Sequence, residues 1–245
     1  MKKAKIGVGI VTYQRPEYFK RAVASVREHL GDIVDEIVGY HDGPLPEAYL
    51  DLDWPKGFGA RAGRQNNGVA HAKNQVITEL LDRGCDYLFI MEDDIEVLDR
   101  KAIVGYLAAY KKTGIPHLNF HGHGDNLESA PLAVSEDGIV FWPNAVGAWS
   151  FYTREALEHV GLMDENFVNA YEHVEHSWRI YKGKIDYGFW PDVAGSEEWL
   201  CAQPNAIENS SIRKDEAAWK ENIHAALAYW RSKDPECPAG DPYLD

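Results

Sequence analysis

Three adjacent carboxylates, Glu92, Asp93 and Asp94, are the residues whose types and spacing most directly indicate chemistry. They follow the short apolar run 87–91, which predicts a buried parallel strand. Ligands of open α/β sheets bind at the carboxyl ends of such strands. Adjacent carboxylates repel one another and need a compensating cation, and Mg²⁺ or Mn²⁺ takes oxygen ligands while leaving positions for phosphate. The triplet therefore predicts a metal–phosphate site, and the alternative is a solvated acidic turn.

A second group of polar residues, Glu172, His173 and Glu175, lies in a segment that predicts a helix. Histidine and carboxylate side chains can exchange protons near neutral pH, so a chemical role is one interpretation of this group. The alternative is structural. Glu172–His176 and Glu175–Arg179 have the i,i+4 spacing that stabilises an exposed helix by about 0.3 kcal/mol a pair.

Composition and charge limit the classes of protein. The 245 residues are 45% hydrophobic and 26% charged, which fits a globular chain of one large or two small α/β domains. The net charge of −14 argues against a broad nucleic-acid footprint and against binding to anionic membranes. The three cysteines form neither a disulfide framework nor a zinc pattern, and no stretch is long enough to span a membrane. We therefore expect a cytoplasmic protein.

The elements that would position these groups follow from apolar periodicity. The first half alternates strands and helices, which predicts a parallel, doubly wound sheet. Pro16 and Gly31 mark the start and the end of its first helix. The expected segments are strands at 4–12, 33–40 and 87–91, helices at 16–30, 69–81 and 102–112, and an irregular region at 44–64.

The second half mixes strands, loops and short helices, and we expect it to complete the same sheet and the rest of the pocket. The expected segments are strands at 117–120, 139–142, 148–152 and 185–190, helices at 154–160, 173–181 and 215–231, and a loop at 121–138. The last helix is expected to pack through Trp219, Ile223, Leu227 and Trp230.

Four segments at or just after the ends of predicted strands carry a family resemblance. They are 12–16 (TYQRP), 41–43 (HDG), 66–74 (NNGVAHAKN) and 92–94 (EDD). Their order and content resemble the nucleotide-sugar-binding half of GT-A-fold glycosyltransferases, above all the family-2-type group, in which an aspartate-any-aspartate motif ends this half. Gln14 and Lys73 stand where that group usually has asparagine and arginine.

The second half extends the resemblance. Residues 147–157 and 160–167 look like the acceptor-side segment of that family. The run 172–179 (EHVEHSWR) is similar to the glutamate-aspartate helix of inverting GT-A enzymes, and also to a helix of the polypeptide GalNAc-transferases, which retain configuration. The acidic triplet also resembles that of N-acetylglucosaminyltransferase I. The likeness runs in order over roughly residues 5–200.

The resemblance implies an α/β fold of the GT-A (Rossmann-like) type, with a mixed, mostly parallel sheet flanked by helices. It implies a single domain over 1–245, with a nucleotide-sugar-binding half (1–98), an acceptor half (99–205) and a C-terminal helix and tail (206–245). The activity it implies is metal-dependent transfer of a sugar from a UDP-sugar to a hydroxyl of a saccharide-type acceptor, with Mn²⁺ or Mg²⁺.

The resemblance implies a role in such a site for the polar residues of these first-half segments. A metal that bridges the diphosphate stabilises the leaving charge, and Asp94 is its expected ligand. Glu92 and Asp93 would contact the metal, its waters or the ribose. Asp42 would accept the uracil N–H, because a carboxylate only accepts hydrogen bonds. The other residues expected at the nucleotide are Thr12, Tyr13 and Arg15 in the first loop, Asn67, Gly68 and Asn74 near a helix start, and Lys73 or Arg64 at the phosphates.

A third metal ligand is expected from the region after the acceptor helix, where Glu197 is the first choice and Asp192 and Glu198 are alternatives.

Three histidines of the acceptor half lack the usual zinc-ligand spacing, so we expect a loop or acceptor-binding role for His117, His121 and His123. Aromatic faces stack on sugars, and the tryptophans of this half are candidates, although core packing is the better interpretation of any single one. They are Trp142, Trp149, Trp178, Trp190 and Trp199.

The base determines the stereochemistry. Inverting relatives use the second acid of the glutamate-aspartate pair as the base, and His173 occupies that position here. We expect the base among Glu172, His173 and Glu175, and prefer inversion. Retention stays open, because a non-acid at this position also occurs in the retaining relatives.

Three other functions are compatible with parts of the sequence. A phage-type transferase acting on modified DNA bases would need a basic face, for which the candidates are Lys2, Lys3, Lys5, Arg61, Arg64, Lys182 and Lys184. A nucleotidyltransferase usually has a Gly-rich phosphate loop near the first strand, which 12–16 lacks. A catalytically inactive nucleotide-sugar-binding module would bind UDP and metal without turnover.

Overall fold

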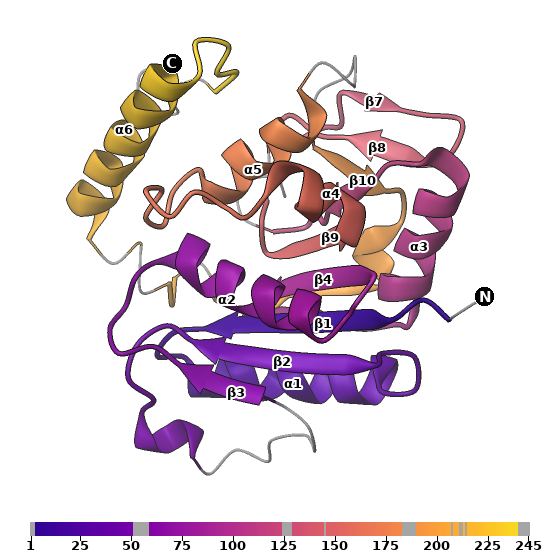
Figure 1. Ribbon diagram of the computed structural model, residues 1–245, viewed down its shortest axis with the longest axis horizontal. Helices are drawn as coiled ribbons and strands as arrows, with labels where there is room; N and C mark the ends of the chain where they lie inside the picture. Colours follow the sequence, from indigo (N-terminus) through magenta and orange to yellow (C-terminus); the bar gives the residue numbers. More distant parts are fainter. Residues whose placement is uncertain are drawn as a thin grey trace.

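A six-stranded sheet is the centre of the computed structural model, which describes residues 3–50, 59–123, 129–144, 146–182, 190–206, 208–210, 213 and 215–239 (Figure 1). In spatial order its strands are β3 (Gly59–Ala62), β2 (Glu36–His41), β1 (Ile6–Thr12), β4 (Tyr87–Glu92), β9 (Trp149–Thr153) and β6 (His117–Asn119). The first four are parallel, and β9 is antiparallel to both of its neighbours. Consequently β6 runs parallel to β4. The predicted mixed, mostly parallel sheet is confirmed.

Helices cover both faces of the sheet, because side chains alternate across each strand. Val8 and Ile10 of β1 belong to one apolar cluster, and Val11 belongs to the other. The first cluster includes α1 (Pro16–Leu30) and α3 (Lys101–Thr113); the second includes α2 (Val69–Asp82), α4 (Arg154–Val160) and α5 (Glu172–Tyr181).

Local sequence explains how closely α2 approaches β1. A Cβ atom at Gly7 would lie 2.6 Å from Leu80, and one at Gly9 would lie 2.8 Å from Val76. Both distances are shorter than packed carbon atoms allow, so glycine at these positions lets the helix lie directly on the strand. This contact fixes the start of α2 beside the carboxyl end of the sheet.

Two small antiparallel sheets and a last helix complete the described chain. One sheet contains β10 (Pro191–Val193), β8 (Ile139–Phe141) and β7 (Ala133–Val134), and the other contains β11 (Leu200–Ala202) and β5 (Ile95–Val97). Helix α6 (Glu216–Lys233) packs against the segment before α5 (Figure 1). Its buried side includes Ile223, Leu227 and Trp230, as predicted. Among the described residues, no helix is long and apolar enough to cross a membrane.

Several predicted boundaries were wrong. The region 44–64 contains a 3-10 turn, Glu47–Tyr49, and the strand β3, whose Gly-Ala-Arg-Ala sequence has no β-branched residue to indicate it. The second strand begins at Glu36, because the residues before it form a turn after α1. Strands β5, β7 and β11 are too short to show a period. Most of the strand predicted at 185–190 lies outside the described residues, and Trp190 precedes β10.

Candidate active site

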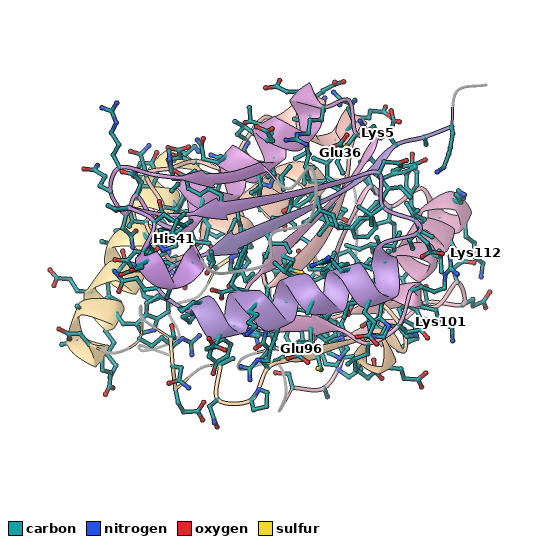
Figure 2. The ribbon with its side chains drawn as sticks, turned by 90° about the horizontal axis from the view of Figure 1, so that it is seen from below. Lys5, Glu36, His41, Glu96, Lys101 and Lys112 are labelled. Carbon is teal, nitrogen blue, oxygen red and sulfur yellow. The ribbon has the colours of Figure 1, made fainter. Side chains whose placement is uncertain are left out.

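The carboxyl edge of the parallel strands collects the residues predicted to do chemistry. Thr12 ends β1, His41 ends β2 and Glu92 ends β4. Figure 2 shows the two ends of the parallel strands: His41 lies at the carboxyl end, and Lys5 and Glu36 lie at the opposite end. Open α/β sheets bind their ligands at this edge.

Asp93 ties the first loop to the acidic turn. The hydroxyl of Thr12 donates to its Oδ2 at 2.6 Å, and the guanidinium of Arg15 pairs with its Oδ1. The hydroxyl of Tyr49 lies 2.8 Å from Thr12 Oγ1 and accepts the backbone N–H of Arg15 at 2.8 Å. Burial raises the pKa of Asp93 to about 7, although the charge of Arg15 opposes that shift. Asp93 is thus fully engaged within the protein.

Asp94 is held less completely. Arg15 Nη1 lies 3.1 Å and His123 Nε2 lies 3.5 Å from its Oδ2. Burial opposes the ionisation of Asp94, but His123 and Arg15 outweigh it and lower the pKa of this carboxyl. Its Oδ1 is buried and has no hydrogen-bond partner within the described part of the chain, and the same holds for His123 Nε2. Asp94 Oδ1 therefore has no partner among the described residues, while His123 Nε2 has only its 3.5 Å ion pair with Asp94 Oδ2.

Lys73 joins the two halves of the site. Its side chain is 1% exposed, and its ammonium lies 2.7 Å from Glu92 Oε1 and donates to the carbonyl of Gly147 at 2.9 Å. A Cβ at Gly147 would lie 2.6 Å from the His173 ring and 2.8 Å from Lys73 Nζ. A side chain at position 147 would therefore collide with His173 and Lys73, and glycine lets both approach the same stretch of backbone.

Glu172 and His173 form a pair at the start of α5. His173 Nδ1 lies 2.9 Å from Glu172 Oε1, and Glu172 is buried. Burial disfavours the charged carboxylate, but His173 and then Lys73 outweigh it and lower the pKa of Glu172 to about 2. A carboxylate that accepts from Nδ1 leaves Nε2 of the imidazole as the basic nitrogen.

Asp42 stabilises a turn. Its carboxylate accepts the backbone N–H of Asn67 at 3.1 Å and that of Gly68 at 2.7 Å, just before α2 begins. Both oxygens are in use, since Oδ1 and Oδ2 each lie 3.1 Å from Asn67 N. Asp42, Asn67 and Gly68 were all predicted at the nucleotide, and they do lie together. The hydrogen bonds of Asp42 position the loop and the start of α2.

Three other predicted nucleotide contacts have different surroundings. Tyr13 lies near the end of β2, with its ring 5.8 Å from that of His41. Asn74 is buried and exchanges hydrogen bonds with the backbone of Met163, each at 2.9 Å, so it holds the segment before α5. Arg64 is exposed, and no described residue pairs with it.

The cations that neutralise the acidic triplet belong to the chain itself. Arg15 pairs with Asp93 and Asp94, and Lys73 pairs with Glu92, so residues of the chain compensate part of the charge of the triplet. Among the described residues, no three His, Cys, Asp or Glu side chains converge as a metal cluster. Asp94 Oδ1 and His123 Nε2 nevertheless fit a Mg²⁺ or Mn²⁺ ion that is completed by phosphate and water.

The candidates for a third metal ligand are placed elsewhere. Glu197 and Glu198 are exposed on a 3-10 turn that follows β10. Asp192 is fully buried, and its oxygens accept from Tyr106, Val193, His121 and Ser196. His123 is the residue that the structure brings to Asp94 in their place.

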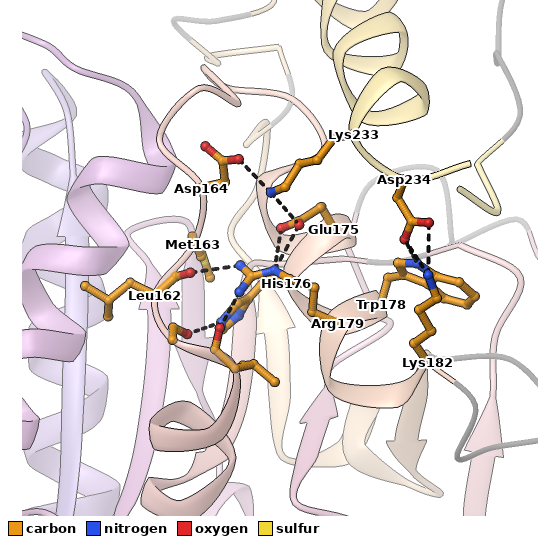
Figure 3. A network of polar contacts seen from close by, with 12 residues as sticks. Leu162, Met163, Asp164, Glu175, His176, Trp178, Arg179, Lys182, Lys233 and Asp234 are labelled. Carbon is orange, nitrogen blue, oxygen red and sulfur yellow. Dashed lines mark hydrogen bonds and ion pairs between the residues drawn. The ribbon is translucent and has the colours of Figure 1, made fainter. Parts of the chain in front are cut away.

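Glu175 belongs to a separate network, shown in Figure 3. Its carboxylate accepts from Arg179 Nε at 2.9 and 3.0 Å, and Lys233 of α6 lies 3.1 Å from it. The predicted Glu175–Arg179 pair is confirmed. The Glu172–His176 pair was wrong, because His176 Nε2 contacts the carbonyl of Gly161 and Glu172 turns to His173.

Three contributors were missed or left without a defined role. Tyr49 lies in the region expected to be irregular, and Gly147 shows its role only through three-dimensional contacts. His123 had a detectable signal, because the sequence His121-Gly122-His123 directly follows a predicted strand. The carboxyl end of that strand, β6, lies on the same edge as Glu92 because the two strands are parallel.

Comparison with known proteins places the fold. No protein-family model matches the chain, and no curated protein matches it in sequence. Solved structures do match. Mannosyltransferase PcManGT from Pyrobaculum calidifontis, in complex with GDP-Man and Mn²⁺, superposes with a TM-score of 0.62 at 14% identity, over 99% of this chain and 67% of that one. The fold is that of GT-A-type glycosyltransferases.

A second protein gives the same result. TarS from S. aureus superposes with a TM-score of 0.61 at 12% identity, over 93% of this chain and 44% of that one. Its fragment 1–349 in complex with UDP gives a TM-score of 0.58 at 13% identity, over 93% of this chain and 72% of the fragment. The present chain therefore spans less than half of full TarS, and at these identities the likeness concerns the fold alone.

Proposed function

We propose that this chain is a glycosyltransferase that moves a sugar from a nucleoside diphosphate sugar to a hydroxyl of a saccharide-type acceptor. The observation that carries the proposal is the meeting of the acidic turn, with its own cations, and the Glu172–His173 pair through Lys73 and Gly147. The neighbouring structures with GDP-Man and with UDP support it.

The first half supplies charge to the leaving group. Lys73 is a buried cation and Arg15 a half-buried one at the carboxyl edge, where a diphosphate would lie. Asp94, with His123 beside it, would hold a Mn²⁺ or Mg²⁺ ion completed by phosphate and water, and that ion would stabilise the negative charge of the departing diphosphate. Preorganised charges in a water-poor site stabilise a developing charge far more than the same charges in water.

His173 is the proposed base. Glu172 accepts from its Nδ1 at 2.9 Å, so Nε2 takes the proton of the acceptor hydroxyl as that oxygen attacks the anomeric carbon. Glu172 stays ionised and stabilises the imidazolium that forms. This arrangement favours inversion of configuration. Glu175 is committed to Arg179 and Lys233 and has a structural role.

A UDP-sugar is the proposed donor, on the sequence resemblance, and a GDP-sugar is the alternative. Asp42 already accepts two backbone N–H groups, so base recognition would use Tyr13 and the backbone around it. The phage-type DNA alternative is weakened, because Lys3 and Lys5 pair with Asp35 and Glu36 at the opposite end of the sheet from this site.

The experiment that tests the proposal is nucleotide release from UDP- and GDP-sugars, with Mn²⁺, Mg²⁺ or EDTA, in the presence of a panel of glycosides. The expected result is metal-dependent release in the wild type that falls by about 100-fold in His173→Ala, as for loss of a general base. Tight UDP binding without release from any donor would instead indicate an inactive binding module. The anomeric configuration of the product distinguishes inversion from retention.

A further inference from the structure

A buried carboxylate on the acceptor side orients His121, which precedes the candidate metal ligand His123 by two residues. Asp192 of β10 is fully buried, and its Oδ2 accepts both the backbone N–H of His121 at 3.0 Å and the Nδ1 of His121 at 2.7 Å. Tyr106 and Ser196 donate to the same carboxylate at 2.7 Å each. A buried carboxylate needs such donors, and together they fix its position.

The plane of the His121 ring is also fixed. The ring stacks on Trp142 with centroids 3.9 Å apart and planes 10° from parallel. With Nδ1 directed to Asp192 and one face covered by Trp142, the imidazole has one polar atom left. No described residue makes a hydrogen bond to that atom, Nε2, and the side chain is 15% exposed.

The position of His121 links it to the candidate active site. Strand β6 ends at Asn119, and Phe120 donates its N–H to Trp149 O at 3.0 Å, while Glu92 donates its N–H to the adjacent Ala148 O at 2.8 Å. Two residues beyond His121, His123 lies 3.5 Å from Asp94. The segment 120–123, which carries His121, therefore starts from the edge of the sheet that holds the acidic turn and returns to it at His123.

A histidine of the preceding strand, β6, shows the contrast. His117 is fully buried, with Nδ1 at 2.8 Å from Phe151 O and Nε2 at 2.6 Å from Ser177 Oγ. Both nitrogens of His117 are used inside the protein, as expected for a structural histidine. His121 has the same kind of anchored Nδ1 but leaves Nε2 for a group from outside.

We propose that His121 is a sugar-binding residue, whose Nε2 accepts a hydrogen bond from a hydroxyl of the donor or acceptor sugar. Asp192 and Trp142 are its positioning residues. Nδ1 carries the proton in the bond to Asp192, so Nε2 presents a lone pair, and sugar hydroxyls are the matching donors. This inference rests on the proposed function, because it places the histidine beside the nucleotide-sugar site.

The test is NMR of the full chain with histidines labelled at ¹³Cε1 and ¹⁵N, in the presence of Mg²⁺. UDP, a panel of UDP-sugars and GDP-sugars, and methyl glucoside, mannoside and N-acetylglucosaminide with saturating UDP are titrated in turn. UDP alone is expected to leave the His121 Nε2 signal unchanged. A shift of that signal with a nucleotide sugar identifies the donor sugar as the ligand, and a shift with a glycoside in the presence of UDP identifies the acceptor sugar.

Two variants distinguish the role of Nε2 from that of Nδ1. His121→Asn keeps a donor for Asp192 and loses Nε2, and we expect it to retain UDP affinity while the sugar that shifts His121 binds at least fivefold more weakly. His121→Gln places a polar atom near the position of Nε2 and should lose less affinity. His159→Asn, at an exposed position of α4, is the control.

Absence of any sugar-dependent shift at His121, or unchanged sugar affinity in His121→Asn, would overturn the inference. Absence of UDP and GDP binding in the wild type would instead overturn the proposed function, so the two failures are distinguishable.

Discussion

Two clusters of buried and half-buried acids in this molecule are both paired with cations, but only one of them has all its carboxylate oxygens paired. The edge cluster consists of Glu92, Asp93 and Asp94 with Arg15 and Lys73. The α6 cluster consists of Asp164 and Glu175 with Arg179 and Lys233 (Figure 3). Both combine carboxylates with cations from distant segments.

The difference lies in the unused atoms. In the α6 cluster every carboxylate oxygen has a donor, since Asp164 accepts from Asn166, Tyr229 and Lys233 and Glu175 accepts from Arg179 and Lys233. In the edge cluster Asp94 Oδ1 is buried without a hydrogen-bond partner among the described residues. Buried polar groups are normally paired, so an unpaired one indicates a place for a ligand. We infer that the edge cluster binds and the α6 cluster stabilises.

The largest expected effect comes from Asp94→Asn. Nucleotide release should fall by about 100- to 1,000-fold, because the substitution removes charge at the candidate metal and diphosphate position. The melting temperature should stay near that of the wild type, since one of two adjacent buried acids is neutralised. Steady-state kinetics and calorimetry of the same preparation measure both.

Lys73→Met should affect both activity and stability. It leaves Glu92 without its 2.7 Å ion pair and Gly147 without its donor, so we expect release to fall about tenfold or more and the free energy of unfolding to fall by about 2 kcal/mol. Lys73→Arg is the matched control, because it keeps the charge. An unchanged rate in Lys73→Met would remove the lysine from the proposed mechanism.

Glu175→Gln should lower stability and leave activity nearly unchanged, the opposite of the effect expected for Asp94→Asn. The substitution breaks a buried pair and leaves Arg179 and Lys233 undercompensated, so the free energy of unfolding should fall by about 3 kcal/mol. Release at a temperature where the variant is folded should stay within about threefold of the wild type. A loss of activity as large as that of Asp94→Asn would erase the distinction between the clusters.

The smallest effect concerns pH. Burial opposes the ionisation of Asp164, but Lys233 and its other hydrogen-bond donors lower its pKa below the ordinary value. Its stabilisation is therefore complete at neutral pH and is lost as pH falls below about 3.9, the unfolded value. Asp164→Asn should cost about 1 kcal/mol at pH 6 and progressively less toward pH 3. A cost that does not change with pH would contradict this assignment.

Sequence reasoning recovered much of the fold because long periodic segments dominate it. The runs that became β1, β4, α1, α2 and α6 carry their apolar faces in the residues themselves. Strand β3 was missed because its sequence has no side-chain pattern typical of a strand. Its pairing with β2 makes it one. The position of the acids at a strand end was also predictable from the same periodicity.

The partners of the site residues could not be predicted. Nothing in the order of residues shows that Arg15 reaches Asp93 across 78 positions, or that Asn74 binds the backbone of Met163. Glu172 and Glu175 are equivalent in sequence, three residues apart on one helix. They differ because one faces Lys73 and Gly147 while the other faces α6.

The most direct test of the central claim is calorimetric titration of UDP and GDP, with and without Mn²⁺, into the wild type, Asp94→Asn and Glu175→Gln. We predict that Mn²⁺ tightens binding of one nucleotide to the wild type and to Glu175→Gln by at least tenfold, about 1.4 kcal/mol, and does not tighten binding to Asp94→Asn. An equal gain in Asp94→Asn, or no nucleotide binding by the wild type, would contradict the account.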